Sequence, residues 1–228
     1  LNNYENWRSF LLSYISLKES IKRVLCNSEI SKLTSLVRSI VSDPKDLWES
    51  EWEIYTYIRR NIVYVNDPPV PIPPPAWSLE EGSYVNETLN SIILSPSETL
   101  NLKQGDCEDQ AILLYAMIKA YEKYIYGETF KLWLIHVVFN DGSKHLAVAF
   151  PVLANGEREL TILDTAGRYY TGTPFRLTSK TPYVELKKYS EWFMEYGGIK
   201  EVTVYNVVDG DLVEVASGGI YEVAQKIS

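Results

Sequence analysis

The sequence contains only two cysteines, Cys26 and Cys107, and two histidines among its 228 residues. Two cysteines are too few for a disulfide framework. The sequence does not exclude a single disulfide bond between them. This scarcity slightly favours a cytoplasmic protein, whereas a chain that starts at Leu1 leaves room for an upstream signal or membrane anchor. Any chemistry that needs a thiol or an imidazole must use one of these four side chains.

Long apolar runs and an excess of positive charge are also missing. No run approaches the roughly 18 apolar residues of a membrane-spanning helix, so no transmembrane segment is predicted. The 22 Lys and Arg residues against 30 Asp and Glu give a net charge of -8, which argues against nucleic acid as a partner. A composition that is 46% hydrophobic, with 17 Tyr and 6 Trp, is typical of a globular protein with a sizeable core.

The first quarter of the chain has a helical pattern. Apolar residues recur at helical spacing over residues 4–25 and again over residues 29–41. Asp43 followed by Pro44 predicts an N-cap and a first helical position for a helix that runs to about Ile62.

A proline-rich stretch follows, DPPVPIPPPAW at residues 67–77, with six of the eleven prolines. Proline density of this kind excludes a helix or a central strand. The stretch predicts a stiff polyproline connector, and one wall of a binding cleft is the alternative.

Residues 106–126 predict a second long helix, with Asp106 as N-cap and Asp109 at the position of a capping acid. One apolar stripe of this helix comprises Ala111, Leu114, Ile118 and Tyr121.

The pattern then alternates with a period of two, which is typical of strands. Three strands at 131–140, 144–152 and 158–164 are joined by DG and NG turns and predict an antiparallel meander. Residues 201–208 and 211–216 predict a further hairpin after a short helix at 190–196.

Cys107 lies at the start of the predicted helix and in line with its apolar stripe, so its side chain should point inward. Unpaired N–H groups at a helix N-terminus favour the thiolate, the nucleophilic form of cysteine. The neighbouring Asp106, Glu108 and Asp109 oppose that effect. The residues alone leave open whether Cys107 is a buried core cysteine or a nucleophile, while Cys26 is interpreted as a core residue.

A nucleophilic cysteine needs a base, and only His136 and His145 are available. If Ala154 pairs with Glu157 across the NG turn, His145 lies on the same sheet face as Asp164, as its diagonal neighbour. A register shift of one residue would separate them.

The same alternation of side chains across the DG turn places His136 on the sheet face of His145 and Asp164 too. His136 lies in the middle of its strand, where a core histidine is the expected role, whereas His145 begins its strand near the sheet end. His145 is therefore the preferred base.

The motifs GDCEDQA, HLAVAF and LDTAG, in the order Cys, His, Asp, resemble those of the transglutaminase-like superfamily of papain-like cysteine enzymes. IYTYIRRNIVY and SPSETLNLKQGDCED resemble the segments that precede the active-site helix, and the match covers roughly residues 50–170. The resemblance implies an α+β fold, in which a helix carrying Cys107 packs on an antiparallel sheet. Extra N-terminal helices would occupy residues 1–45, the catalytic core residues 46–175, and strands completing the same domain residues 176–228.

The resemblance also implies roles for individual residues. Cys107 would be the nucleophile, His145 its base and later the acid, and Asp164 the group that orients the imidazole. The backbone N–H of Cys107 would be one oxyanion donor. Trp77 is the candidate for the second donor and Gln104 the alternative, while a purely packing role for Trp77 stays open.

Asp106 and Asp109 are interpreted as structural residues near the site. GDCED alone supplies too few oxygen ligands for a calcium loop. Zinc held by Cys107, His145 and Asp164 is a weaker alternative, so neither a metal nor another cofactor is expected.

The implied reaction is acyl transfer at an amide bond of a protein or peptide substrate, through a thioester. A peptidase or amidase is the favoured activity for a chain of this size. Glutamine crosslinking and a non-catalytic binding module are the alternatives, and the complete set of three motifs argues against the last.

Overall fold

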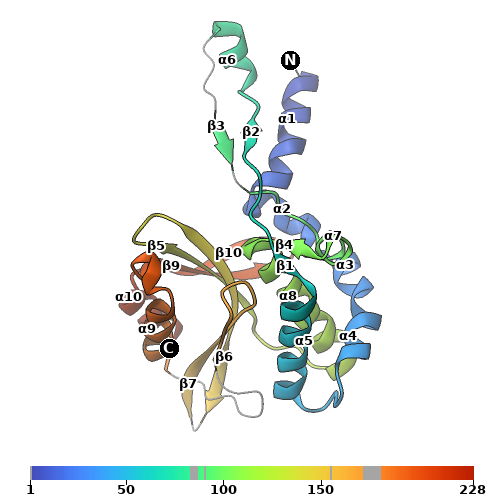
Figure 1. The fold of residues 1–228 in the computed structure, drawn as a ribbon, viewed down its shortest axis with the longest axis vertical. Helices are drawn as coiled ribbons and strands as arrows, with labels where there is room; N and C mark the ends of the chain where they lie inside the picture. Colours follow the sequence, from blue (N-terminus) through green and yellow to red (C-terminus); the bar gives the residue numbers. More distant parts are fainter. Residues whose placement is uncertain (1, 83–86, 90, 155, 172–180) are drawn as a thin grey trace.

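The computed structural model describes residues 2–82, 87–89, 91–154, 156–171 and 181–228. A sheet lies between a layer of N-terminal helices and a pair of C-terminal helices, and an arm projects from one end (Figure 1). Within the described ranges, no helix combines the length and apolarity needed to cross a membrane.

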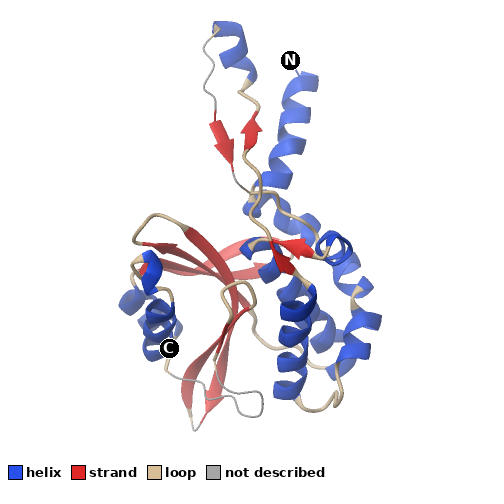
Figure 2. Cartoon of the chain, in the orientation of Figure 1, coloured by secondary structure: helices blue, strands red, loops and turns tan. Residues whose placement is uncertain are grey.

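Six antiparallel strands form the central sheet in the order β10-β9-β5-β6-β7-β8. The predicted meander and hairpin are confirmed. The strand bounds are β5 (Trp133–Phe139), β6 (Lys144–Ala154), β7 (Glu157–Asp164), β8 (Tyr169–Tyr170), β9 (Ile199–Val208) and β10 (Asp211–Gly218). Figure 2 shows how the strands and helices segregate, as expected for the α+β class.

The N-terminal helices are shorter than their apolar pattern predicts. The two predicted segments become α1 (Asn2–Ile15), α2 (Leu17–Val24), α3 (Asn27–Lys32) and α4 (Thr34–Ile40), followed by α5 (Leu47–Asn61). The predicted N-cap of α5 is wrong. Asp46, rather than Asp43, accepts a hydrogen bond from the backbone N–H of Glu49 at 2.9 Å, whereas Asp43 binds the N–H of Lys45 in the preceding turn.

The helix that carries Cys107, α8 (Cys107–Tyr121), is buried on nearly all sides and continues into a short π-helix, η1 (Glu122–Tyr126). On one side, Ile112 and Met117 pack in the same core as Val148 of the sheet. Helices α9 (Pro182–Trp192) and α10 (Ile220–Ile227) cover the opposite face of the sheet, around a second core, and the 3₁₀ turn η2 (Met194–Tyr196) follows α9. Two apolar layers thus hold the sheet and fix the position of α8.

The proline-rich stretch is part of the projecting arm rather than a free connector. Strand β2 (Val70–Ile72) pairs with β3 (Glu87–Leu89), and α6 (Ala76–Glu81) follows β2. The carbonyl groups of Pro73 and Pro74 accept hydrogen bonds from side chains of α1, at 2.8 and 2.7 Å. The arm therefore stands beside α1, as Figure 1 shows.

A short parallel pair leads the chain into the candidate site. Strand β1 (Val63–Tyr64) directly follows α5 and pairs with β4 (Gln104–Gly105), the segment between α7 (Pro96–Leu102) and α8. The pairing holds residues 63 and 64 against the backbone that precedes Cys107.

Candidate active site

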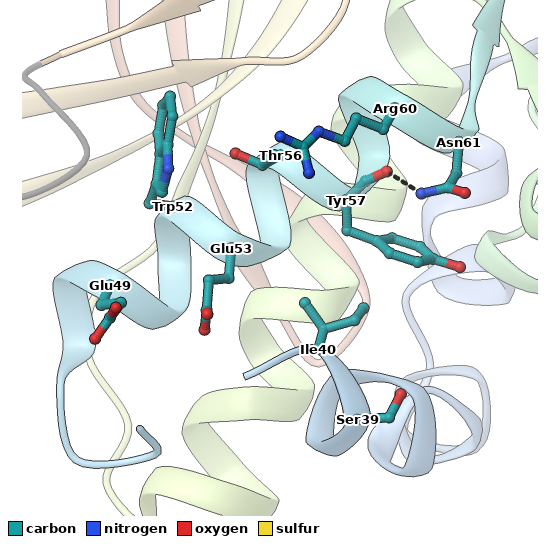
Figure 3. A pocket seen from close by; sticks show the side chains of 9 residues that line it. All are labelled: Ser39, Ile40, Glu49, Trp52, Glu53, Thr56, Tyr57, Arg60 and Asn61. Carbon is teal, nitrogen blue, oxygen red and sulfur yellow. Dashed lines mark hydrogen bonds between the residues drawn. The ribbon is translucent and has the colours of Figure 1, made fainter. Parts of the chain in front are cut away.

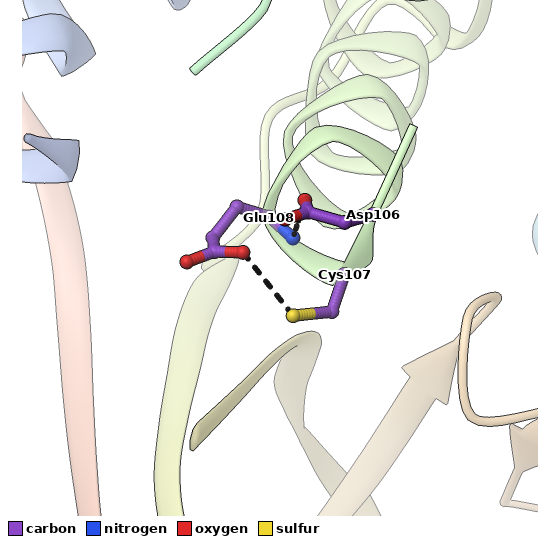
Figure 4. A group of neighbouring side chains, drawn as sticks. All are labelled: Asp106, Cys107 and Glu108. Carbon is purple, nitrogen blue, oxygen red and sulfur yellow. Dashed lines mark hydrogen bonds between the residues drawn. The ribbon is translucent and has the colours of Figure 1, made fainter. Parts of the chain in front are cut away.

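Cys107 is the first residue of α8, and Asp106 caps the helix as predicted (Figure 4). The Asp106 side chain accepts hydrogen bonds from the backbone N–H groups of Glu108 and Asp109, at 3.0 and 3.3 Å. The cap fixes the first turn, and with it the thiol of Cys107, which is 7% exposed.

Asp109 ties the first turn of α8 to the preceding chain. Its Oδ1 accepts the backbone N–H of Leu94 at 2.9 Å, while its Oδ2 has no hydrogen-bond partner among the described residues. Burial raises the pKa of Asp109 to about 7. A Cβ on Gly105 would lie 2.6 Å from the Cβ of Asp109, so this approach requires glycine. Asp109 thus joins the segment before α7 to the first turn of α8.

His145 and Asp164 form a hydrogen-bonded pair. The β6–β7 register runs from Ala154 opposite Glu157, as predicted from the NG turn, whose Asn155 lies outside the described residues. Nε2 of His145 lies 2.8 Å from Oδ2 of Asp164, and the two residues are 9% and 1% exposed. The diagonal relation inferred from the turn is therefore present.

Two further donors hold the Asp164 carboxylate. The backbone N–H of Gly167 donates to Oδ1 and the hydroxyl of Tyr189 donates to Oδ2, both at 2.7 Å. With the imidazole of His145, three donors fix this buried side chain. Tyr189 lies in α9, a part of the sequence without a recognisable motif, and the sequence analysis missed it.

Helix α8, which begins with Cys107, packs against strand β6, which carries His145. The backbone N–H of Leu146 is close enough to the sulfur to favour its ionised form. Because Leu146 directly follows His145, the N-terminus of α8 meets the strand at the residue beside the imidazole. The structure therefore brings all three predicted catalytic residues into one region.

Electrostatics keep the resting thiol protonated. Burial, followed by the carboxylates of Glu108 and Asp106, raises the pKa of Cys107 well above its usual value, and the thiol lies 3.2 Å from Oε2 of Glu108. Burial disfavours the imidazolium of His145, but the Asp164 charge outweighs it and raises the His145 pKa. The helix N-terminus alone thus does not produce a thiolate here.

The predicted position of His136 is wrong. His136 pairs with Leu146 and Val137 with His145, so the two histidines lie on opposite faces of the sheet. The cause is a loop of three residues: Phe139 N–H binds the Ser143 carbonyl at 2.9 Å, and Gly142 adopts φ 90°. The additional loop residue inverts the parity.

The two predicted oxyanion donors differ in position. Trp77 lies in α6 of the arm and is 60% exposed, and Figure 1 shows α6 far from α8. The structure does not bring Trp77 to Cys107, and we do not assign it as a donor. Gln104 is exposed in β4, directly before the Gly105–Asp106 turn into α8, and stays a candidate.

Tyr64 is a neighbour of Cys107 that the sequence analysis missed. The β1–β4 pairing sets it opposite Gly105, two residues before Cys107. Tyr64 is half-buried, and this burial, followed by its interaction with the ionised form of Cys107, raises the pKa of the phenol, which stays protonated. Its segment, IYTYIRRNIVY, was noted as a resemblance, but no local pattern predicts a parallel pairing across forty residues.

Among the described residues, one group places three potential metal ligands within 4.8 Å of one another. It comprises Asp106, Cys107 and Glu108. Figure 4 shows that hydrogen bonds already join them. Oδ1 of Asp106 caps the helix and Oε2 of Glu108 accepts from the thiol. The cap and the thiol contact account for this arrangement without a cation.

Two cavities bear on where a ligand could bind. One of about 560 Å³ is lined by His145 and Tyr64, and therefore adjoins the candidate catalytic residues. Another of about 600 Å³ lies along α5 around Trp52, Tyr57 and Arg60, as Figure 3 shows. The second is not lined by any of the three catalytic candidates.

Comparison with known proteins decides the family. The model of a family described as "Transglutaminase-like domain" matches residues 31–205. This chain belongs to the transglutaminase-like domain family. The resemblance inferred from the three motifs is thereby confirmed.

One curated relative shares limited sequence identity with this transglutaminase-like chain. The UPF0252 protein of Archaeoglobus fulgidus is 27% identical over 134 residues, which are 58% of this chain and 40% of that protein. The chain thus spans less than half the length of this relative.

Solved structures of LapG from Legionella pneumophila are also similar. The calcium-bound form has 17% identity and a TM-score of 0.39, covering 77% of this chain and 80% of that one. The EGTA-treated form has 14% identity and a TM-score of 0.41, with 90% and 85% covered. Scores this low do not support a correspondence between individual residues.

Proposed function

We propose that this transglutaminase-like chain hydrolyses an amide bond through a cysteine thioester, as a peptidase or amidase. The observation that carries the proposal is the buried His145–Asp164 pair, at 2.8 Å, beside the N-terminus of the helix that begins with Cys107. A thiol, a base and a carboxylate that orients the base are the parts that nucleophilic acyl transfer requires.

The first half of the reaction transfers the thiol proton as the sulfur attacks. Because Nε2 of His145 is engaged by Asp164, Nδ1 is the nitrogen left to accept the proton of Cys107. The sulfur–carbon bond forms and the carbonyl oxygen becomes an oxyanion. His145 then returns the proton to the leaving amine as the carbon–nitrogen bond breaks, and a thioester remains.

The second half uses water. His145 takes a proton from the water that attacks the thioester, the carbon–sulfur bond breaks, and the proton passes to the sulfur. The products are a carboxylic acid and the regenerated thiol. Asp164, held by three donors, keeps the imidazole in one tautomer and stabilises the imidazolium in both halves.

Two donors would stabilise the oxyanion. The backbone N–H of Cys107, at the unpaired end of α8, is the first. The phenol of Tyr64 is our candidate for the second donor and Gln104 is the alternative, because Tyr64 lines the cavity beside His145 and Gln104 does not.

The test is the rate of iodoacetamide labelling at Cys107, read by peptide mass spectrometry with Cys26 as internal reference. Labelling near neutral pH should slow in His145→Gln and stay unchanged in His136→Gln, because His136 lies on the sheet face opposite to His145 and cannot take its place beside Asp164. Equal rates in the wild type and His145→Gln would refute the assignment of the base.

A peptide library then tests turnover, with Cys107→Ala as the inactive control. Release of new carboxyl and amino termini indicates hydrolysis, whereas incorporation of an added amine indicates transamidation. Cleavage that survives in Cys107→Ala would refute the proposal.

A further inference from the structure

The cavity beside His145 has a cationic lining in a chain of net charge -8. Lys144 and Arg168 line it, and its lining includes no Asp or Glu. In the part of the chain that the structure describes, neither cation forms an ion pair. Neither of the two positive charges at this cavity is therefore neutralised by a direct ion pair.

Aromatic side chains supply the remaining surface. The ring of Phe193 lies 5.2 Å from the His145 ring and the ring of Phe139 lies 6.3 Å from it, measured between centroids. Tyr196, 38% exposed, continues this cluster outward at 5.3 Å from Phe139. The cavity thus joins an apolar wall at the imidazole to a partly exposed rim.

Tyr64 connects the cavity with the nucleophile. It lines the cavity, and strand pairing sets it opposite Gly105, two residues before Cys107. A group held in the cavity would therefore lie close to the bond that Cys107 attacks.

We propose that this cavity binds a carboxylate of the substrate, next to the scissile amide, through Lys144 and Arg168. The inference rests on the proposed function for the position of that amide. Arg168 lies in the turn between β7 and β8, and Lys144 is the first residue of β6, directly before His145, so two different segments bring the cations to the lining of this cavity. A guanidinium and an ammonium together suit a carboxylate, and the aromatic wall suits the apolar part of the residue that bears it.

One nearby acid opposes an anion. Glu108 lies on α8 with its carboxylate 3.2 Å from the thiol, and it is not among the lining residues. A substrate carboxylate would therefore bind within the cavity, which Arg168 and Lys144 line and Glu108 does not.

Binding to the Cys107→Ala chain tests the inference without any need for reactivity. Three alanine pentapeptides with acetylated N-termini are compared by isothermal titration calorimetry. The first has a central Glu and an amidated C-terminus, the second a free C-terminal carboxylate, and the third no charge. Tighter binding of the first identifies a side-chain carboxylate as the ligand, and tighter binding of the second a chain terminus.

Single charge removals locate the site. Arg168→Gln and Lys144→Gln should each weaken binding of the preferred peptide about threefold, the effect of one unit charge at roughly 6 Å in a water-like dielectric. Lys45→Gln is the matched control, because Lys45 lies far from the cavity. Lys45 precedes the 15-residue helix α5 and the cavity residue Tyr64 follows it, so the helix separates the two by about 22 Å. Equal binding of all three peptides, no binding at millimolar concentration, or insensitivity to Arg168→Gln and Lys144→Gln would overturn the inference.

A second measurement separates this inference from the proposed function. The ratio of iodoacetate to iodoacetamide labelling at Cys107 should fall about threefold in Arg168→Gln, and the uncharged iodoacetamide corrects for any change in the reactivity of the thiol itself. Carboxylate binding without iodoacetamide reactivity would refute the catalytic proposal alone. Rapid iodoacetamide labelling without selectivity for the carboxylate would refute the inference alone.

Discussion

Replacing Glu108 by Gln should lower the pKa of the Cys107 thiol. In the wild type the sulfur lies 3.2 Å from Oε2 of Glu108, and both the negative charge and the hydrogen bond favour the protonated thiol. Glutamine keeps the shape and an accepting oxygen but removes the charge. Burial and Asp106 continue to act, so the pKa should fall without reaching that of an exposed thiol.

The size of the effect follows from Coulomb's law. A unit charge about 4 Å away contributes about 1 kcal/mol in bulk water and about 4 kcal/mol at the dielectric of a protein surface. Glu108 is partly buried, so we expect a value near the lower end, about 1–2 kcal/mol. One pKa unit corresponds to about 1.4 kcal/mol, and the thiolate population near neutral pH should rise about tenfold.

The assay is the pH dependence of iodoacetamide labelling at Cys107, with Glu128→Gln as the control for the loss of one surface carboxylate. Glu128 is exposed in the segment between η1 and β5. The Glu108→Gln curve should shift to lower pH by about one unit and the Glu128→Gln curve should stay with the wild type. A curve that stays in place or moves to higher pH for Glu108→Gln would refute the claim that Glu108 protects the thiol.

Three other substitutions test the surroundings of the site and the core. Tyr189→Phe removes one donor from Asp164 while keeping the ring, so the carboxylate becomes more basic and the His145 pKa, followed by NMR, should rise; an unchanged pKa would exclude this coupling. Burial and then Glu122 raise the pKa of the fully buried Glu51, so its stabilising contribution is present below about pH 4.5 and is lost as the pH rises through the folded-state pKa. Urea unfolding of Glu51→Gln between pH 5 and 8 should therefore show a flatter pH dependence than the wild type, and parallel curves would contradict this reasoning. Gly167→Ala would force a methyl group against Asp164 and Phe193. It should therefore cost about 1–3 kcal/mol of folding free energy and slow the labelling of Cys107. The control Gly219→Ala, which has open space around the added methyl group, should change neither quantity.

The two turns of the meander show what a sequence can and cannot specify. The NG turn allows a two-residue loop, and the register from Ala154–Glu157 that follows from it places His145 beside Asp164 as expected. The DG turn has the same signature, but its loop also includes Asn140, which binds the carbonyl groups of Gly197 and Gly198. That contact with a distant segment removes Asn140 from the strand and moves His136 to the other face.

Other features depend on pairings that no local pattern contains. The apolar spacing of residues 4–25 predicts one helix, but packing divides it at Ser16. The composition of the proline-rich stretch does not predict that side chains of α1 donate hydrogen bonds to the carbonyl groups of that stretch. Tyr64 approaches Cys107 through a parallel pairing with β4, and Tyr189 reaches Asp164 from α9. The three motif residues were predictable because local turns and a helix start position them.

The two halves of the candidate site differ in how firmly they are held. Asp164 has three donors and His145 is buried against it, so the proposed base is held in one position in the resting structure. Cys107, in contrast, is restrained by a hydrogen bond to Glu108, a partly buried side chain on the first turn of α8. Rotation of that one side chain would free the thiol without any backbone movement. Activation of the thiol should therefore depend on displacing Glu108. The reaction rate of a substrate that itself displaces Glu108 should change little in Glu108→Gln. The labelling rate of a small alkylating agent, which does not displace Glu108, should show the full increase.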